Sequence, residues 1–147
     1  MRISAKGEYA IRAMLDLSLH HGQGLIPIQD VARRQAIPQR YLEQVLLLLK
    51  RAGFLVSKRG ATGGYHLARP PEEISVGHVL RAIEGRLTPL EVAGREPRES
   101  RVAERDLADF WQEVADAVAA VIDRTTFSNL AERVTARRSS HRAMYHI

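Results

Sequence analysis

Two short β-prone runs joined by a glycine-rich segment are the feature that most constrains how this 147-residue chain can fold. The first run covers residues 54–59 and the second covers residues 65–68. Three of the five residues between them are glycines. Runs of this kind around a glycine-rich tip are typical of a β-hairpin. The sequence therefore predicts a small hairpin, with helical patterns on both sides of it.

Three helical segments precede the hairpin. Apolar residues recur at helical spacing in residues 8–20, and a short amphipathic segment follows at residues 28–35. After a tight turn, a third helix is predicted for residues 38–52, with Pro38 in the first helical position and Gly53 as the stop signal. Helix, short helix, turn, helix and hairpin is the order of a winged helix-turn-helix. We therefore expect a mainly α fold with a small β-wing.

A second region begins after the hairpin. Ser75 is expected to cap a fourth helix over residues 76–84, and the charged residues 93–106 are expected to form a flexible loop. We place one domain at residues 1–92, dimerisation helices at residues 107–136 and a flexible tail at residues 137–147. Within the dimerisation region, a long helix is predicted for residues 107–123 and a short one for residues 127–134.

The long helix carries an apolar stripe with heptad-like spacing. Such a wide apolar face needs a partner, and a second copy of the same helix is the simplest one. Packing on the chain's own first domain is the alternative. The predicted dimerisation residues are Leu107, Phe110, Trp111, Val114, Ala117, Val118 and Val121.

Charge is unevenly divided along the chain. Residues 1–69 hold 11 Lys and Arg against 4 Asp and Glu, a net charge of +7, whereas residues 70–147 have a net charge of −2. A basic half joined to a slightly acidic half is expected when one half binds a polyanion and the other binds protein. A basic surface with no partner is the alternative that composition leaves open.

The third helix has the chemistry of a DNA-recognition helix. In a helix-turn-helix the second helix enters the major groove with its N-terminal residues toward the base edges. Arg40 can pair with guanine, Gln39 and Gln44 with adenine, and Glu43 can accept from cytosine. Arg59 in the wing is expected near the minor groove. The full set of predicted DNA-binding residues is Arg2, Ser4, Lys6, Gln39, Arg40, Tyr41, Glu43, Gln44, Lys58, Arg59, Gly60, Gly63, Gly64 and Tyr65.

Four of these predictions have their own reasons. Arg2, Ser4 and Lys6 precede the first predicted helix and are expected to contact phosphates, which positions the protein without reading sequence. Tyr41 can donate to a phosphate, and a buried aromatic ring is its equal alternative.

Several other functions lack the residues they need. The chain has no cysteine, which excludes a disulfide, a Cys-ligated zinc site and a thiolate-held iron–sulfur cluster. Its histidines show no metal-ligand spacing, and neither a nucleophile motif nor a phosphate-binding glycine loop before a helix is present. We therefore expect no cofactor, no metal and no enzymatic activity. Without a secretory signal or a membrane-spanning run, a cytoplasmic location is expected.

Four segments together resemble one family of regulators. Residues 3–10, 37–44 and 58–65, together with Ile83-Glu84-Gly85, are similar to the Rrf-type winged helix-turn-helix family, which includes the iron–sulfur regulator IscR and the cysteine-metabolism repressor CymR. The resemblance implies a homodimeric bacterial transcription factor. It would dimerise through the long C-terminal helix and bind double-stranded DNA at a pseudo-palindromic operator.

The resemblance also separates two branches of that family. Many members hold an iron–sulfur cluster with three cysteines in the loop before the long helix, where this chain has Arg95, Arg98 and Arg101. Glu8 stands where some relatives supply a carboxylate ligand. Residues 87–92, 111–130 and 144–147 instead resemble the cluster-free cysteine-repressor branch.

The last residues suggest a protein partner. Serine acetyltransferase inserts a tail ending in Ile into O-acetylserine sulfhydrylase (CysK), and the resemblance implies similar docking here. The predicted partner-binding residues are Met144, Tyr145, His146 and Ile147, with His146 standing where an aromatic residue is expected. A tail that is merely disordered is the alternative. The implied function is repression of cysteine and sulfur genes through that enzyme, and a response to another ligand or stress signal is the alternative.

Overall fold

The computed structural model describes residues 3–85 and 101–145 of the chain. It contains six α-helices in these residues, one two-stranded antiparallel sheet and a short 3-10 helix, η1. The elements are α1 (Ala5–Leu19), α2 (Ile28–Gln35), α3 (Gln39–Arg51), β1 (Leu55–Lys58), β2 (Gly64–Leu67), η1 (Pro71–Glu73), α4 (Val76–Glu84), α5 (Arg101–Arg124) and α6 (Phe127–Tyr145). The expected mainly α fold with a small β-wing is confirmed.

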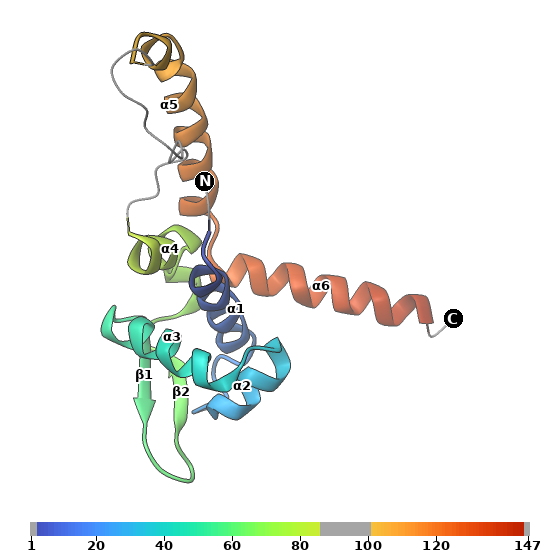
Figure 1. Ribbon diagram of the computed structural model, residues 1–147. Helices are drawn as coiled ribbons and strands as arrows, with labels where there is room; N and C mark the ends of the chain where they lie inside the picture. Colours follow the sequence, from blue (N-terminus) through green and yellow to red (C-terminus); the bar gives the residue numbers. More distant parts are fainter. Residues whose placement is uncertain (1–2, 86–100, 146–147) are drawn as a thin grey trace.

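Helix α1 is the centre of the packed body. It contacts α2, α3, α4, α6 and β2, and the wing formed by β1 and β2 extends from one end of the body (Figure 1). Ala10, Ala13, Met14 and Leu17 of α1 are buried at the three- and four-residue spacing of one helix face. Phe127, the first residue of α6, is fully buried in the same core, which anchors the end of α5 and the start of α6 to the body.

The wing is attached to the body by backbone pairing. Leu55 pairs with Leu67 and Lys58 with Gly64 along the hairpin, while Tyr65 exchanges two hydrogen bonds of 2.8 and 2.9 Å with the backbone of Ile26. A Cβ atom at Gly64 would lie 2.4 Å from the carbonyl oxygen of Ile26, so only glycine permits this close pairing. The base of the wing therefore has a fixed position relative to the helices.

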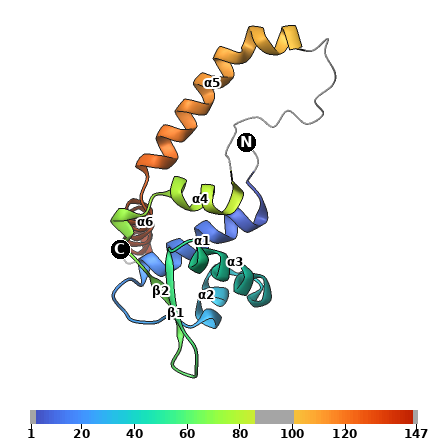
Figure 2. The same ribbon diagram turned by 90° about the vertical axis from the view of Figure 1, so that its left-hand side faces the viewer.

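Two helices depart from the body in different directions. Helix α5 extends on the side of α4 away from the wing, and α6 leaves the body sideways (Figures 1 and 2). The junction between them is held at the N-terminus of α4, where Val76 N–H donates to the carbonyl of Thr125 at 2.8 Å and Phe127 N–H donates to that of Ile74 at 3.0 Å.

The boundaries of α2 and α4 agree with prediction, and α3 begins one residue later because Pro38 is its N-cap. Two predicted helix boundaries in the C-terminal part of the chain were wrong. Helix α5 begins at Arg101, so residues 101–106 are helical and not part of a flexible loop. Because only two of these six residues are apolar, the segment was predicted as a loop, but Arg, Ala and Glu are good helix formers.

The second correction concerns the C-terminal segment. Helix α6 continues to Tyr145, whereas the prediction ended it at Val134 and placed a flexible tail from residue 137. Residues 135–145 contain neither Gly nor Pro, and their polar residues surround the helix, so no periodic apolar pattern revealed it. Predictions for Arg2, the loop residues 93–100, residues 87–92, His146 and Ile147 lie outside the described residues.

Candidate DNA interface

The N-terminal half of α3 presents a polar face beside its buried one. Leu42, Val45, Leu46 and Leu49 are buried at less than 1% exposure and hold the helix against the body. All four predicted base-reading residues are exposed and lie on the opposite side: Gln39, Arg40, Glu43 and Gln44. The structure thus brings these four side chains together on one accessible helix face.

A tight turn sets the entry of α3. Ala36 adopts a left-handed conformation with φ of 52°, and Ile37, which is 3% exposed, donates its N–H to the carbonyl of Ala32 at 3.0 Å. Pro38 then caps the N-terminus of α3, and its carbonyl accepts from Leu42 N–H at 2.9 Å. The angle between α2 and α3 therefore depends on a buried residue in the middle of the turn.

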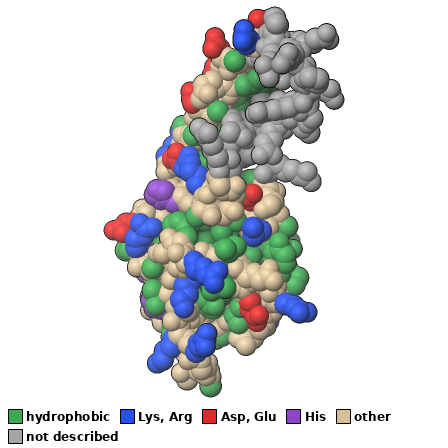
Figure 3. All heavy atoms as spheres, turned by 60° about the vertical axis from the view of Figure 1, so that its left-hand side comes forward, with side chains coloured by type: hydrophobic (Ala, Val, Ile, Leu, Met, Phe, Trp, Pro, Cys, Tyr) green, Lys and Arg blue, Asp and Glu red, His purple; other side chains and the backbone are tan. Residues whose placement is uncertain are grey.

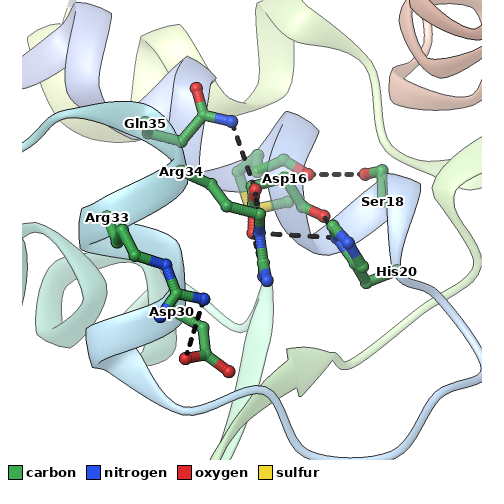
Figure 4. Close-up of polar contacts among 8 residues, drawn as sticks. Asp16, Ser18, His20, Asp30, Arg33, Arg34 and Gln35 are labelled. Atoms are coloured by element: carbon green, nitrogen blue, oxygen red, sulfur yellow. Dashed lines mark hydrogen bonds and ion pairs between the residues drawn. The ribbon is translucent and has the colours of Figure 1, made fainter.

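A buried carboxylate ties α1 to the end of α2, next to this turn (Figure 4). Asp16 is 1% exposed and accepts hydrogen bonds from both Nε and Nη2 of Arg34, at 3.0 and 2.9 Å. The Gln35 amide donates to the same carboxylate at 3.2 Å, and Arg12 of α1 donates to the Gln35 carbonyl. We call Arg12, Asp16, Arg34 and Gln35 the α1–α2 clamp.

The clamp was missed in the sequence. The hydrogen bond with Asp16 raises the pKa of Arg34 above its ordinary value. A signal was present, since Asp16 is an acidic residue within the apolar face of α1 and needs a partner when buried. That partner is 18 residues away on another helix, where local patterns do not identify it.

The environment of Tyr41 is intermediate between its two predicted alternatives, a phosphate donor and a buried aromatic ring. Its ring packs edge-to-face on Tyr9 at a centroid distance of 5.3 Å, and 38% of the residue remains exposed. The aromatic contact orients the ring, while the exposed part leaves it accessible to a ligand.

The tip of the wing is exposed and shaped by glycine. Lys58, Arg59 and Gly60 are all exposed, and Gly63 N–H donates to the Gly60 carbonyl at 3.0 Å. A Cβ at Gly63 would lie 2.1 Å from the Lys58 carbonyl oxygen, so the tip requires glycine there. Gly60, Gly63 and Gly64 thus set the shape of the wing, and Tyr65 is half-buried at its base.

Lys6 and Ser4, the predicted phosphate contacts near the N-terminus, differ in how available their side chains are to a phosphate. Lys6 is exposed. Ser4 caps α1 by accepting from Gly7 N–H at 3.1 Å, and its hydroxyl donates to Glu84 Oε1 at 2.5 Å. The Ser4 N–H also donates to this oxygen, at 3.1 Å. The hydroxyl is therefore already engaged inside the protein.

Further basic residues near the wing were not singled out from the sequence. Lys50 and Arg51 are exposed at the C-terminal end of α3, and Arg69 lies over the Phe54 ring at 5.7 Å. Figure 3 shows Lys and Arg side chains at the wing and on the adjoining face of the body. These positive charges can add a sequence-independent attraction to phosphates.

At the opposite end of the molecule, α5 leaves its apolar stripe uncovered. Leu107, Phe110, Trp111 and Val121 are 38–51% exposed, Ala117 is exposed, and Val114 and Val118 are half-buried. Helix α5 is fixed to α4 near its C-terminal end, where Arg81 pairs with Asp123 close to Gly77. The chain's own first domain therefore leaves most of the stripe exposed.

Within residues 3–85 and 101–145 the structure describes no helix that could cross a membrane. Among the side chains of residues 3–85 and 105–145 it describes no cluster of three or more His, Asp or Glu that could hold a metal. What it does describe, a helix-turn-helix with an exposed polar recognition helix and a basic wing, defines a winged-helix DNA-binding protein.

Comparison with known proteins gives the family. Residues 3–133 match the Rrf2 model, described as an iron-dependent transcriptional regulator. The HTH-type transcriptional regulator CymR of Bacillus subtilis is 37% identical over 131 residues, covering 89% of this chain and 90% of that protein. IscR of Aliivibrio salmonicida is 34% identical over 132 residues, covering 88% and 77%. The chain belongs to the Rrf2 family of transcriptional regulators.

Solved structures agree with this assignment. The structure of CymR, titled the global cysteine regulator of B. subtilis, matches with a TM-score of 0.77 at 34% identity, covering 90% of this chain and 98% of that one. The Staphylococcus aureus CymR structure matches with a TM-score of 0.69 at 38% identity, covering 88% and 97%.

Proposed function

We propose that this protein is a homodimeric transcriptional repressor that reads an operator with α3 and grips the flanking DNA with its wing. The observation that carries the proposal is the exposed face of Gln39, Arg40, Glu43 and Gln44 beside a wing whose tip holds Lys58 and Arg59. Arginine, glutamine and glutamate side chains can distinguish base pairs by their major-groove donors and acceptors. Lysine and arginine at the wing add phosphate or minor-groove contacts.

The dimer is proposed to form through the apolar stripe of α5. Two copies related by a twofold axis would present two recognition helices to two half-sites, which explains a pseudo-palindromic operator. Footprinting of the purified protein on genomic fragments tests this function. Protection of paired inverted half-sites is the expected result, and binding without sequence preference would overturn it.

We further propose that the regulated genes serve cysteine and sulfur metabolism. The support is similarity to the CymR proteins, one of which is titled a global cysteine regulator. The chain has no cysteine to ligate an iron–sulfur cluster. The signal that controls its operator binding therefore has to come from a source other than such a cluster. The proposed source is O-acetylserine sulfhydrylase (CysK), bound through residues 144–147.

In this scheme the enzyme complex stabilises the operator-bound repressor, and O-acetylserine releases it by competing for the enzyme's pocket. Since α6 is helical through Tyr145, its last turn has to unwind for residues 144–147 to enter such a pocket. Titration of the protein with the sulfhydrylase, with and without O-acetylserine, tests the partner. Binding that O-acetylserine reverses supports the scheme, and absence of binding overturns it.

The helical state of Tyr145 favours a second candidate. If α6 keeps its last turn, the same operator-binding dimer would respond to another small ligand or stress signal without the enzyme. A variant lacking residues 145–147 distinguishes the two candidates. It loses sulfhydrylase binding in the first candidate and keeps its normal response in the second.

A further inference from the structure

The distal half of α6 is helical although its residues are exposed. Residues 135–145 are all exposed, and this part of the helix projects away from the body (Figure 1). A helical segment of this length is marginally stable in water unless another surface covers it. Because its polar residues surround the axis, the covering surface has to be recognised by charge and not by an apolar stripe.

This half of α6 is strongly basic. Arg133, Arg137 and His141 follow one another at four-residue spacing along one side, and Arg138 and Arg142 do so along the adjacent side. Four of these residues line a hollow on the helix surface: Arg137, Arg138, His141 and Arg142. Among residues 3–85 and 105–145, the ion pairs involve none of these four.

Helix α5 carries the complementary charge. Asp106, Asp109, Glu113 and Asp116 are exposed and spaced by three, four and three residues. Each of these acidic residues directly precedes a residue of the apolar stripe, so the two sets have the same spacing. The acidic residues therefore form a border along the stripe. We call these four residues the acidic border of α5. Only Asp116 accepts a side-chain hydrogen bond in the described part of the chain, from Gln112 at 2.9 Å.

Within one chain the two helices do not meet along these surfaces. They leave their junction in different directions, and none of the ion pairs found in residues 3–85 and 105–145 joins α5 to α6 (Figures 1 and 2). Within the described residues their charges are therefore not matched by each other, and another molecule can match them. A second copy carries both surfaces, and the exposed apolar stripe next to the acidic border is where a second copy is already proposed to bind.

We infer that residues 137–142 of α6 dock on the acidic border of α5 in a second copy of this chain. The inference rests on the proposed homodimer and adds a second contact to it, made twice by the twofold symmetry. The contact brings arginines against carboxylates at the edge of an apolar interface, where charges select the partner and its register. DNA is the other polyanion that an arginine-rich helix can bind.

Reversal of charge on α6 tests this contact. The variant Arg137→Glu/Arg138→Glu/Arg142→Glu places like charges opposite the acidic border, and we expect the dimer dissociation constant to rise about tenfold or more at low salt. Sedimentation equilibrium without DNA measures the constant. The matched control, Lys50→Glu/Arg51→Glu/Lys58→Glu, removes the same charge from the DNA-binding half and leaves dimerisation unchanged.

Reversing the charges of the acidic border of α5 in the same protein provides the decisive test of the contact. Adding Asp109→Lys/Glu113→Lys/Asp116→Lys to the α6 variant restores opposite charges, so the dissociation constant returns to within about threefold of the original. Circular dichroism confirms that each variant keeps its helices.

The outcomes separate the inference from the proposed function. An unchanged dimer in the α6 variant, or a weakened dimer that the α5 reversal does not restore, overturns the inference. If the α6 variant keeps its dimer but loses operator affinity, α6 binds DNA and the inference is wrong. If the unaltered protein is a monomer, the proposed homodimer and the inference fail together.

Discussion

Arg59 is the side chain whose position most directly tests the wing. It is exposed at the tip, where glycines bring the backbone close to any bound surface. We predict that Arg59→Ala weakens operator binding by about 1–3 kcal/mol, because a guanidinium contact to DNA is lost. Fluorescence anisotropy with labelled operator measures the change.

The control for this substitution is Arg105→Ala. Arg105 is exposed on α5, far from the wing, and the same loss of charge there leaves operator affinity unchanged (Figure 1). Wild-type affinity in the Arg59→Ala protein would show that the wing tip does not touch DNA.

Asp16 is the residue on which the α1–α2 clamp depends. Its carboxylate is buried and receives two hydrogen bonds from Arg34 and one from Gln35. Asp16→Asn leaves the Arg34 guanidinium without its counter-charge, so we expect the free energy of unfolding to fall by about 1–3 kcal/mol. Urea denaturation followed by circular dichroism measures it.

A neighbouring pair gives the matched control. Asp30 and Arg33 are 3.4 Å apart, and their side chains are 37% and 73% exposed (Figure 4). Asp30→Asn should lower the free energy of unfolding by less than about 1 kcal/mol. Equal effects of the two substitutions would show that burial of Asp16 has no energetic consequence.

At the scale of single elements, the attachment of α5 to α4 has a predicted pH dependence. The hydrogen bond from Arg81 lowers the pKa of Asp123 below its ordinary value. The pair therefore stabilises the fold above the unfolded-state pKa of about 4, and this contribution is lost as the pH falls through the lowered pKa of Asp123.

Asp123→Asn tests this sign. Because the two side chains are 42% and 47% exposed, the substitution should reduce the free energy of unfolding by less than about 1 kcal/mol at pH 7. The difference from wild type should disappear in acid, below the lowered pKa. A difference that grows with acidity would contradict the assigned sign.

Elements differed in how well the sequence predicted them. Helices with one buried face, such as α2, α3 and α4, showed an apolar period and capping residues, so their boundaries followed from local patterns. The beginning of α5 is mostly charged and the second half of α6 is exposed and mostly polar, and neither gave such a period. Their helical state depends on backbone propensity, which composition indicates only weakly.

At the scale of the whole molecule, assembly is the main open prediction. Phe110 is 51% exposed near the N-terminal end of the α5 stripe, with its ring 4.8 Å from that of Trp111. Phe110→Asp would bury a charge in the proposed interface and should weaken the dimer by about 2 kcal/mol or more. Light scattering across a concentration series measures the dimer affinity.

Operator binding should weaken together with dimerisation, since each copy then holds only one half-site. Ala108→Asp places the same charge at an exposed position beside the stripe and should have little effect. A Phe110→Asp protein that remains fully dimeric would exclude α5 as the interface.

Local patterns in the sequence were sufficient for the hairpin, for helix α3 and for the exposure of its four predicted base-reading residues. Periodicity, proline and glycine act over a few neighbouring residues, so they can be recognised in the order of the chain. The family resemblance rested on the same segments, and the structure confirmed the fold class they imply.

Only the tertiary structure revealed contacts between residues distant in the chain. Asp16 and Arg34 are separated by 18 residues and Ser4 and Glu84 by 80, and no local pattern specifies either pair. The same holds for the directions of α5 and α6, which depend on Phe127 entering the core and on the backbone bonds of Val76 and Thr125. The chain order determines which faces are apolar or charged, whereas the packing of distant segments decides which of those faces stay exposed for the proposed contacts with DNA and with a second copy.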